Sequence, residues 1–191
     1  AGAWTRQMVR LAPIDAWGRS RAALRIERRP EFIVSASSDH VLGLLSHRLG
    51  FPTRRFYGHR GTITALAQDE GHARVISASA DTTIRLWSLV QGQCTHVLRD
   101  HSRPVRCLAL DVSRRILVSA CDGGEIRQWC LDKPDRPSRW VGCHDAPIKA
   151  LGLTSSGHVL AGDAQGFLRR WSVTQQGVQD GAESPGEVVA A

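Results

Sequence analysis

The stretch RVISASADTTIRLWSL, residues 74–89, decides the fold of this chain. Two short apolar segments flank the polar turn ADTT, and the second segment ends in Trp87. His59 lies fifteen residues upstream of the stretch. Ser77, His59 and Asp81 are the residue types of a hydrolase triad, so these side chains either catalyse or hydrogen-bond to one another as a structural fastener. The rest of the sequence decides between the two interpretations.

The stretch belongs to a repeat. Three tryptophans, Trp87, Trp129 and Trp171, are spaced 42 residues apart. Three histidines, His59, His101 and His144, recur at nearly the same interval, with spacings of 42 and 43 residues. After each histidine come three short apolar segments, separated by turn-forming residues, and the third ends in the tryptophan. This pattern is typical of antiparallel strands joined by tight turns.

A fourth, degraded copy precedes these three. Residues 32–47 align with the opening stretch, with Ser35 and Asp39 at the serine and aspartate positions and Leu45 at the tryptophan position. Its first strand is expected at residues 13–17, followed by a long loop. Copies that recur at one period indicate an array of structural repeats.

The predicted fold class is all-β. The only candidate for a helix is residues 19–29, because no other segment has helical periodicity over about ten residues. A sheet of about 40 residues cannot bury both faces alone and must stack on its neighbours. We therefore expect about four β-propeller blades of four antiparallel strands. The expected propeller region is 1–173, with units at about 10–56, 57–98, 99–139 and 140–173, and residues 174–191 are expected to be a disordered polar tail.

The repeats resemble those of the WD-repeat, or WD40, β-propeller family. The resemblance rests on "GH" before the first strand, on "SASADTTIRLW", and on the period of 42 residues. It implies that His59, Ser77, Asp81 and Trp87 form one hydrogen-bonded chain inside a blade. A buried blade offers neither the exposed serine nor the oxyanion hole that a nucleophile needs. The fastener is therefore the favoured interpretation, and the chain is not expected to be an enzyme.

The other units depart from this pattern. The third unit has His101, Ser119 and Trp129, but Gly123 stands at the aspartate position. The fourth unit has His144 and Trp171, but Ala161 and Gln165 stand at the serine and aspartate positions. We expect only the second unit to have a complete hydrogen-bonded chain.

The number of repeats predicts an incomplete ring. The resemblance implies a ring of about seven blades, and the sequence shows four units. An open arc exposes apolar sheet faces at its two ends, so self-association through those blades is expected. Residues 4–9 read as an outer strand that could complete the fourth blade, and they are equally expected if a further blade precedes them. The sequence thus leaves three alternatives: a fragment of a larger propeller, which is favoured, a pair of copies, or an unusually small ring.

Composition limits the partners and the compartment. No apolar run is long enough to span a membrane. Five cysteines without metal-type pair spacing favour buried thiols in a reducing compartment, cytoplasmic or nuclear, with a zinc site from scattered His and Cys as the alternative. They are Cys94, Cys107, Cys121, Cys130 and Cys143. No cofactor or metal motif is recognised, so none is expected.

The net charge of +7 lies entirely in residues 1–60, which hold 11 arginines and four acidic residues. An RNA- or phosphate-binding segment built on Arg28, Arg29, Arg54 and Arg55 is the alternative function. The resemblance favours a non-catalytic scaffold that binds other proteins. Its binding rim is expected where the loop before each first strand meets the turn between the second and third strands. The predicted rim residues are Arg60, Thr82, Ser102, Arg103, Gly124, Asp145 and Gln165.

Overall fold

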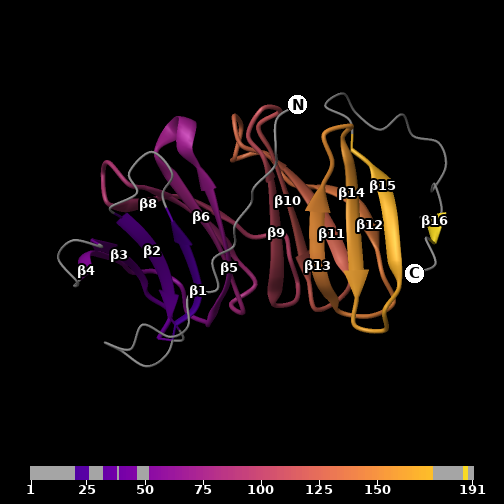
Figure 1. The fold of residues 1–191 in the computed structure, drawn as a ribbon, viewed down its shortest axis with the longest axis horizontal. Coiled ribbons are helices and arrows are strands. Elements are labelled where there is room, and N and C mark those ends of the chain that lie inside the picture. The colour runs from indigo at the N-terminus through magenta and orange to yellow at the C-terminus, as the bar shows by residue number, and fades with distance from the viewer. Residues whose placement is uncertain (1–19, 26–31, 38, 47–51, 174–186, 189–191) are drawn as a thin grey trace.

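The computed structural model describes residues 20–25, 32–37, 39–46, 52–173 and 187–188. These residues form four antiparallel sheets of four strands each (Figure 1). Their one helical element is the single 3-10 turn η1, Glu70–His72. The all-β fold class is therefore confirmed.

Each sheet is one blade, numbered along the chain. Blade one has β1 (Ser20–Arg25), β2 (Phe32–Ser37), β3 (Leu42–Ser46) and β4 (Pro52–Phe56). Blade two has β5 (Ile63–Asp69), β6 (Arg74–Ser79), β7 (Ile84–Ser88) and β8 (Gln93–Leu98). Blade three has β9 (Val105–Asp111), β10 (Ile116–Cys121), β11 (Glu125–Cys130) and β12 (Arg139–Cys143). Blade four has β13 (Ile148–Leu153), β14 (His158–Asp163), β15 (Leu168–Ser172) and β16 (Glu187–Val188).

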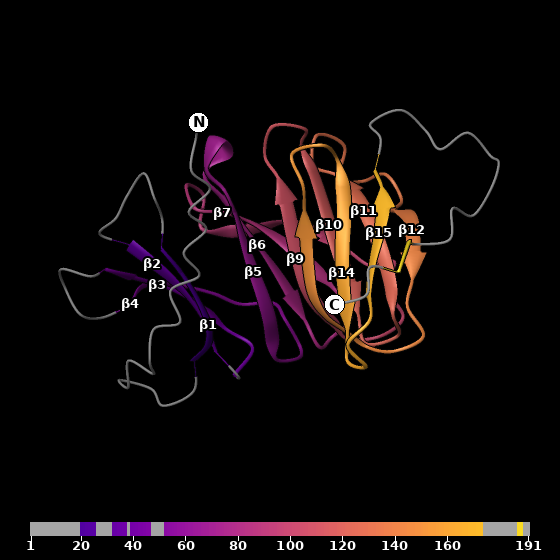
Figure 2. The same ribbon diagram turned by 45° about the vertical axis from the view of Figure 1, so that its right-hand side comes forward.

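The strands of every blade follow one another as a meander, each paired with the next. The first strand of each blade contacts the first strand of the next, β1 with β5, β5 with β9, and β9 with β13. Blades one and four lie at opposite ends of this series, so the described strands form an open arc rather than a ring (Figure 2). The expected incomplete propeller is confirmed.

Three apolar clusters bind the blades together, one at each junction. The first joins blades one and two and contains Phe56 and Trp87. The second joins blades two and three and contains Leu86 and Trp129. The third joins blades three and four and contains Trp171. Each tryptophan thus packs against the blade that precedes its own. Burial on both faces explains why the strands between these junctions read as nearly continuous apolar runs.

Two parts of the sequence interpretation change. The first strand of blade one, β1, occupies Ser20–Arg25. It lies within the segment that was predicted to be a loop, where residues 19–29 were the only candidate for a helix. Residues 13–17, the predicted first strand, lie outside the described part of the chain. The pairing of β1 with β2, rather than local propensity, determines its conformation. At the other end, β16 pairs with β15 at Arg169 and Arg170. Glu187–Val188 therefore forms the outer strand of blade four, although it belongs to the segment 174–191 that was expected to be a disordered tail. Residues 4–9, the other candidate for this outer strand, lie outside the described part of the chain.

One backbone feature recurs in all four blades. The turn between the second and third strands has a residue with positive φ five positions before the tryptophan, or before Leu45 in blade one. These residues are His40 (φ 71°), Thr82 (φ 70°), Gly124 (φ 80°) and Gly166 (φ 92°). Only glycine takes this left-handed conformation without cost, so in blades one and two the turn is held against a steric preference.

Candidate functional site

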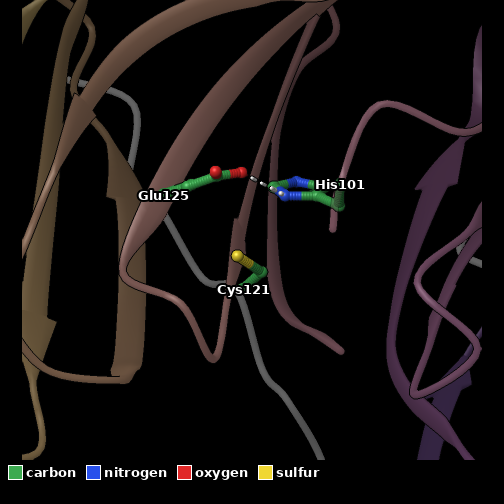
Figure 3. A group of neighbouring side chains, drawn as sticks. All are labelled: His101, Cys121 and Glu125. Carbon is green, nitrogen blue, oxygen red and sulfur yellow. Dashed lines mark ion pairs between the residues drawn. The ribbon is translucent and has the colours of Figure 1, made fainter. Parts of the chain in front are cut away.

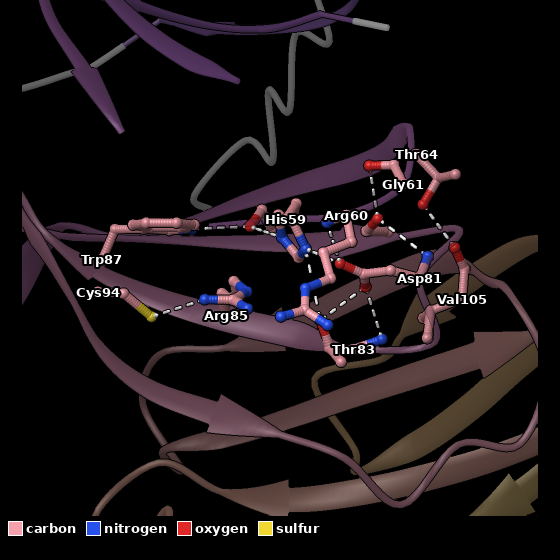
Figure 4. Close-up of polar contacts among 12 residues, drawn as sticks. His59, Arg60, Gly61, Thr64, Asp81, Thr83, Arg85, Trp87, Cys94 and Val105 are labelled. Atoms are coloured by element: carbon pink, nitrogen blue, oxygen red, sulfur yellow. Dashed lines mark hydrogen bonds and ion pairs between the residues drawn. The ribbon is translucent and has the colours of Figure 1, made fainter. Parts of the chain in front are cut away.

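In blade two, four side chains form a continuous, largely buried chain of hydrogen bonds, which we call the latch (Figure 4). The indole Nε1 of Trp87 donates to Ser77 Oγ at 2.7 Å. Ser77 Oγ also lies 2.7 Å from His59 Nε2, and His59 Nδ1 lies 2.8 Å from Asp81 Oδ2. Because a carboxylate only accepts, His59 Nδ1 carries the proton, and Nε2 accepts the proton of Ser77. Every polar group of the latch then has a partner.

The charges of the latch follow from its burial. Burial lowers the pKa of His59, although its hydrogen bond to Asp81 acts in the opposite direction. Burial alone would raise the pKa of Asp81, but hydrogen bonds from Thr83, the Arg60 amide and His59 outweigh it and hold that pKa well below its usual range. The latch therefore holds a neutral imidazole beside an ionised carboxylate at neutral pH.

The latch fastens two chain segments that are distant in sequence. Asp81 Oδ2 accepts the backbone N–H of Arg60 at 2.8 Å, and Asp81 Oδ1 accepts the N–H of Thr83 at 2.9 Å. Ser79 Oγ donates to the carbonyl of Gly61 at 2.8 Å. The loop before β5 and the turn between β6 and β7 are thus tied together at one end of the blade. A side chain at Gly61 would meet the backbone of Asp81, so these segments touch directly.

Blade four has a latch of a different composition. His144 Nδ1 lies 3.1 Å from Asp163 Oδ2, and His144 Nε2 donates to the carbonyl of Ala161 at 3.0 Å. Gln165, which the alignment placed at the aspartate position, is exposed, and its backbone N–H donates to Asp163 Oδ1. Burial would raise the pKa of Asp163, but the amides of Phe167 and Gln165 and the His144 ring lower it further than burial raises it.

Asp163 is therefore a latch residue that the sequence interpretation missed. Asp163 lies eight residues before its tryptophan, as Ser79 does in blade two, whereas Asp81 lies six residues before Trp87. The sequence does show an acidic residue next to this turn. It is overlooked when the aspartate is expected only at six residues before the tryptophan. Blade four thus has a histidine–carboxylate pair that the sequence interpretation did not include, but with Ala161 at the serine position it lacks the complete chain of blade two.

Blade three keeps the inner half of the latch and lacks the outer half. Trp129 Nε1 donates to Ser119 Oγ at 2.7 Å, and Ser119 Oγ lies 2.7 Å from His101 Nε2. With Gly123 at the aspartate position, His101 Nδ1 is buried and makes no hydrogen bond. Asp122, one residue earlier, pairs instead with Arg106 through three short contacts.

In blade one, the serine and the aspartate at the corresponding positions make long hydrogen bonds. Ser35 Oγ donates to the carbonyl of Gly43 at a long 3.5 Å, and Asp39 Oδ1 accepts the N–H of Val41 at 3.3 Å. Leu45 replaces the tryptophan, so no indole can donate to Ser35.

Most of the predicted rim residues stand at the latched ends of the blades. Five of them are exposed: Arg60, Ser102, Arg103, Asp145 and Gln165. Thr82 is half-buried. Gly124 is buried, and a side chain there would meet the carbonyl of His144, so this position serves the backbone and cannot contact a partner through a side chain. Asp145, in the loop between β12 and β13, is paired with Arg169 of β15 at 3.2 Å.

The basic segment contributes less to a common surface. Arg54 and Arg55 are exposed on β4, but Arg54 Nη1 donates to the carbonyl of Leu89 in blade two at 3.0 Å. Arg28 and Arg29 lie outside the described residues.

The geometry defines repeated β-propeller blades whose recurring hydrogen bonds are internal and structural. Residues 50–88 and 92–130 match the WD domain, G-beta repeat (WD40) family. These two central repeats therefore match the WD40-repeat family, as the resemblance implied. Repeats of this family are typically non-catalytic and generally mediate protein–protein interaction.

A comparison with solved structures finds the same architecture in the computationally designed Ika4 protein. The two chains superpose with a TM-score of 0.66 at 25% sequence identity, over 75% of this chain and 86% of that chain. The comparison with curated proteins gave no match.

Proposed function

We propose that this protein is a non-catalytic scaffold that binds other proteins through the exposed rim at the latched ends of its blades. The observation that carries the proposal is the rigid support of that rim. The loop that displays Arg60 is fixed by the bond from its own backbone N–H to Asp81 and by the buried His59 ring beside it. Because the backbone of this loop is already fixed, little backbone freedom is lost on binding, which favours affinity.

The chemistry of the rim suits an acidic or mixed-charge partner. Arg60 and Arg103 are exposed in the corresponding loops of neighbouring blades, and arginine is enriched at interface anchors because it forms bidentate and stacked contacts. The environment of Ser77 favours a structural role over a catalytic one. Its side chain is fully buried and bonded to both His59 and Trp87, which supports a structural role.

Capture of partners followed by substitution tests this proposal. Arg60→Ala and Arg103→Ala should each weaken a captured partner by about 1–2 kcal/mol or more, with unchanged circular dichroism and thermal unfolding. Gln91→Ala, an exposed position at the turn between β7 and β8, is the matched control and should bind normally. The proposal fails if both arginine variants bind as tightly as the wild type while substitutions on the outer strands abolish binding.

We also propose self-association through the open face of blade four. In blade three, Val118 and Ile126 are fully buried in the junction with blade four. The equivalent residues of blade four, Leu160 and Leu168, are only half-buried. A second copy that covers this face would bury the same kind of surface that the internal junctions bury.

An intracellular location, cytoplasmic or nuclear, fits this role. The support is that all five cysteines are free thiols, and that they include the buried Cys121. Within the described residues, no helix has the length and hydrophobicity needed to cross a membrane.

A further inference from the structure

Blade three carries an unexplained group of side chains where its latch is interrupted. His101, Cys121 and Glu125 place one ligand atom each within 4.8 Å of the others (Figure 3). His101 comes from the loop before β9, Cys121 from the end of β10 and Glu125 from the start of β11. His101 and Cys121 are buried, while the Glu125 side chain is 31% exposed.

The strongest sign of a ligand site is His101 Nδ1. The ring is buried, its Nδ1 makes no hydrogen bond, and the nearest carboxylate oxygen, Glu125 Oε2, is 3.7 Å away, beyond hydrogen-bonding distance. The same nitrogen meets a carboxylate at 2.8 Å in blade two and at 3.1 Å in blade four. A buried polar atom without a partner is costly, so the site is incomplete as it stands.

The position of Cys121 is the second sign. Cys121 occupies the register position that Asp163 occupies in blade four, eight residues before the tryptophan. Asp163 accepts the backbone N–H groups two and four residues further along the chain. The corresponding amides of Gly123 and Glu125 point at Cys121 and lower the pKa of its thiol, against the larger effect of burial, which raises it. Two backbone amides therefore lie beside the sulfur and favour its thiolate form, although burial has the larger effect on the pKa.

We propose that His101 Nδ1, Cys121 Sγ and a Glu125 carboxylate oxygen bind a divalent zinc ion that completes the latch of blade three. Nitrogen, thiolate sulfur and carboxylate oxygen are the three donor types that zinc accepts in proteins. Zinc bonds of about 2.0–2.3 Å require neighbouring donors to lie about 3.3–3.8 Å apart, so small side-chain rotations suffice. Three protein donors leave the fourth tetrahedral position to water.

The surrounding groups orient the ligands. His101 Nε2 lies 2.7 Å from Ser119 Oγ, and when Nε2 carries the proton it donates to Ser119, which leaves the Nδ1 lone pair free for the metal. Arg127 Nε donates to Glu125 Oε2 at 3.4 Å and holds the carboxylate beside the group. Burial and the nearby Arg127 lower the pKa of His101 to about 4, so its ring is neutral at neutral pH. Binding of the ion releases the thiol proton of Cys121 to solvent.

Cobalt and zinc titrations of the metal-free full chain test the site. Cobalt(II) should give the ultraviolet charge-transfer band of a thiolate ligand and the visible bands of tetrahedral coordination, and zinc should displace it at one equivalent. Cys121→Ala should abolish the charge-transfer band and weaken zinc at least about 100-fold, and Glu125→Gln should weaken it about 10–100-fold. Cys130→Ser, an exposed thiol at the far end of β11, is the control and should change neither result.

An X-ray absorption measurement on the zinc-loaded wild type keeps the test independent of how the variants fold. One sulfur scatterer at about 2.3 Å supports the site, and a shell of nitrogen and oxygen alone overturns it. The proposal is also wrong if cobalt gives no thiolate band, or if that band persists in Cys121→Ala and is lost in Cys130→Ser.

Discussion

Asp163 Oδ2 lies 3.1 Å from His144 Nδ1, so Asp163 performs in blade four the role that Asp81 performs two residues further along the hairpin of blade two. Both carboxylates also accept backbone amides of their own turn. Replacement of Asp163 leaves a buried imidazole nitrogen and two amides without an acceptor. Asp163→Ala should therefore lower the midpoint of urea unfolding clearly, while Gln165→Ala, in the same turn, should leave it within error. The reverse order would show that Gln165 is the latch residue after all.

Trp87 is expected to be the most costly single loss in blade two. Trp87→Ala removes a fully buried indole that packs on Phe56 and donates to Ser77, and it should destabilise by about 3–5 kcal/mol. Asp81→Ala should cost about 1–3 kcal/mol. Val90→Ser, at a 76% exposed position, serves as the control in the same denaturant titrations. Near-zero effects for both latch variants would mean that the latch does not form in solution.

Gly124 and Gly166 have equivalent positive φ angles but different surroundings, so their replacement should cost different amounts. Gly166→Ala meets nothing within 4 Å and should lose only the conformational preference, roughly 1 kcal/mol. Gly124→Ala suffers the same loss and also collides with the carbonyl of His144, so it should cost clearly more. Thermal unfolding of the two variants side by side measures the difference, and equal midpoints would contradict the close approach of these loops.

The lowered pKa of His101 predicts an acid-sensitive blade three. Unfolded histidine takes up a proton near pH 6.5, whereas burial delays protonation of the native ring to about pH 4. Between these values the unfolded state binds more protons, so stability falls as the pH falls, by up to about 3 kcal/mol. In the presence of a chelator, His101→Gln should show a shallower loss of urea stability from pH 7 to pH 4. An identical slope in the variant would show that His101 does not carry the effect.

The open face of blade four predicts concentration-dependent assembly. Light scattering should show an apparent mass that rises with protein concentration. Leu160→Glu combined with Leu168→Glu should reduce that rise, because charged side chains cannot be buried in such a contact without a partner. Val90→Glu, elsewhere on the surface, should not reduce it. A wild-type chain that stays monomeric at all concentrations would rule out this contact.

The spacing of the tryptophans and histidines was enough to predict the blades, because each blade needs the same side chains at nearly the same distances along the chain. Trp87, Trp129 and Trp171 each end the third strand of a blade, as the period predicts. The resemblance to the WD40 family is confirmed for the repeats that match it.

The features that escaped prediction depend on spatial rather than local relations. Asp163 serves its histidine from another turn position because either position lies within reach of the ring. β1 is arginine-rich and has little strand signal of its own, and it is a strand because β2 lies beside it. The group of His101, Cys121 and Glu125 has no recognisable spacing, since its members meet only when the loop before β9 folds over the turn between β10 and β11.

Each tryptophan packs on the blade before its own, so the two directions along the arc are not equivalent. Trp171 lies directly over Gly142 of blade three, and Trp87 lies against Phe56 of blade one, so each latch is shielded from water by the blade before it. Loss of one blade would therefore hydrate the latch of the blade that follows, while the latch of the blade before it would stay dry. Opening that starts in blade one would be transmitted toward blade four, whereas fraying of blade four would stop at its own junction. Amide hydrogen exchange should therefore spread from blade one toward blade four, and not in the reverse direction.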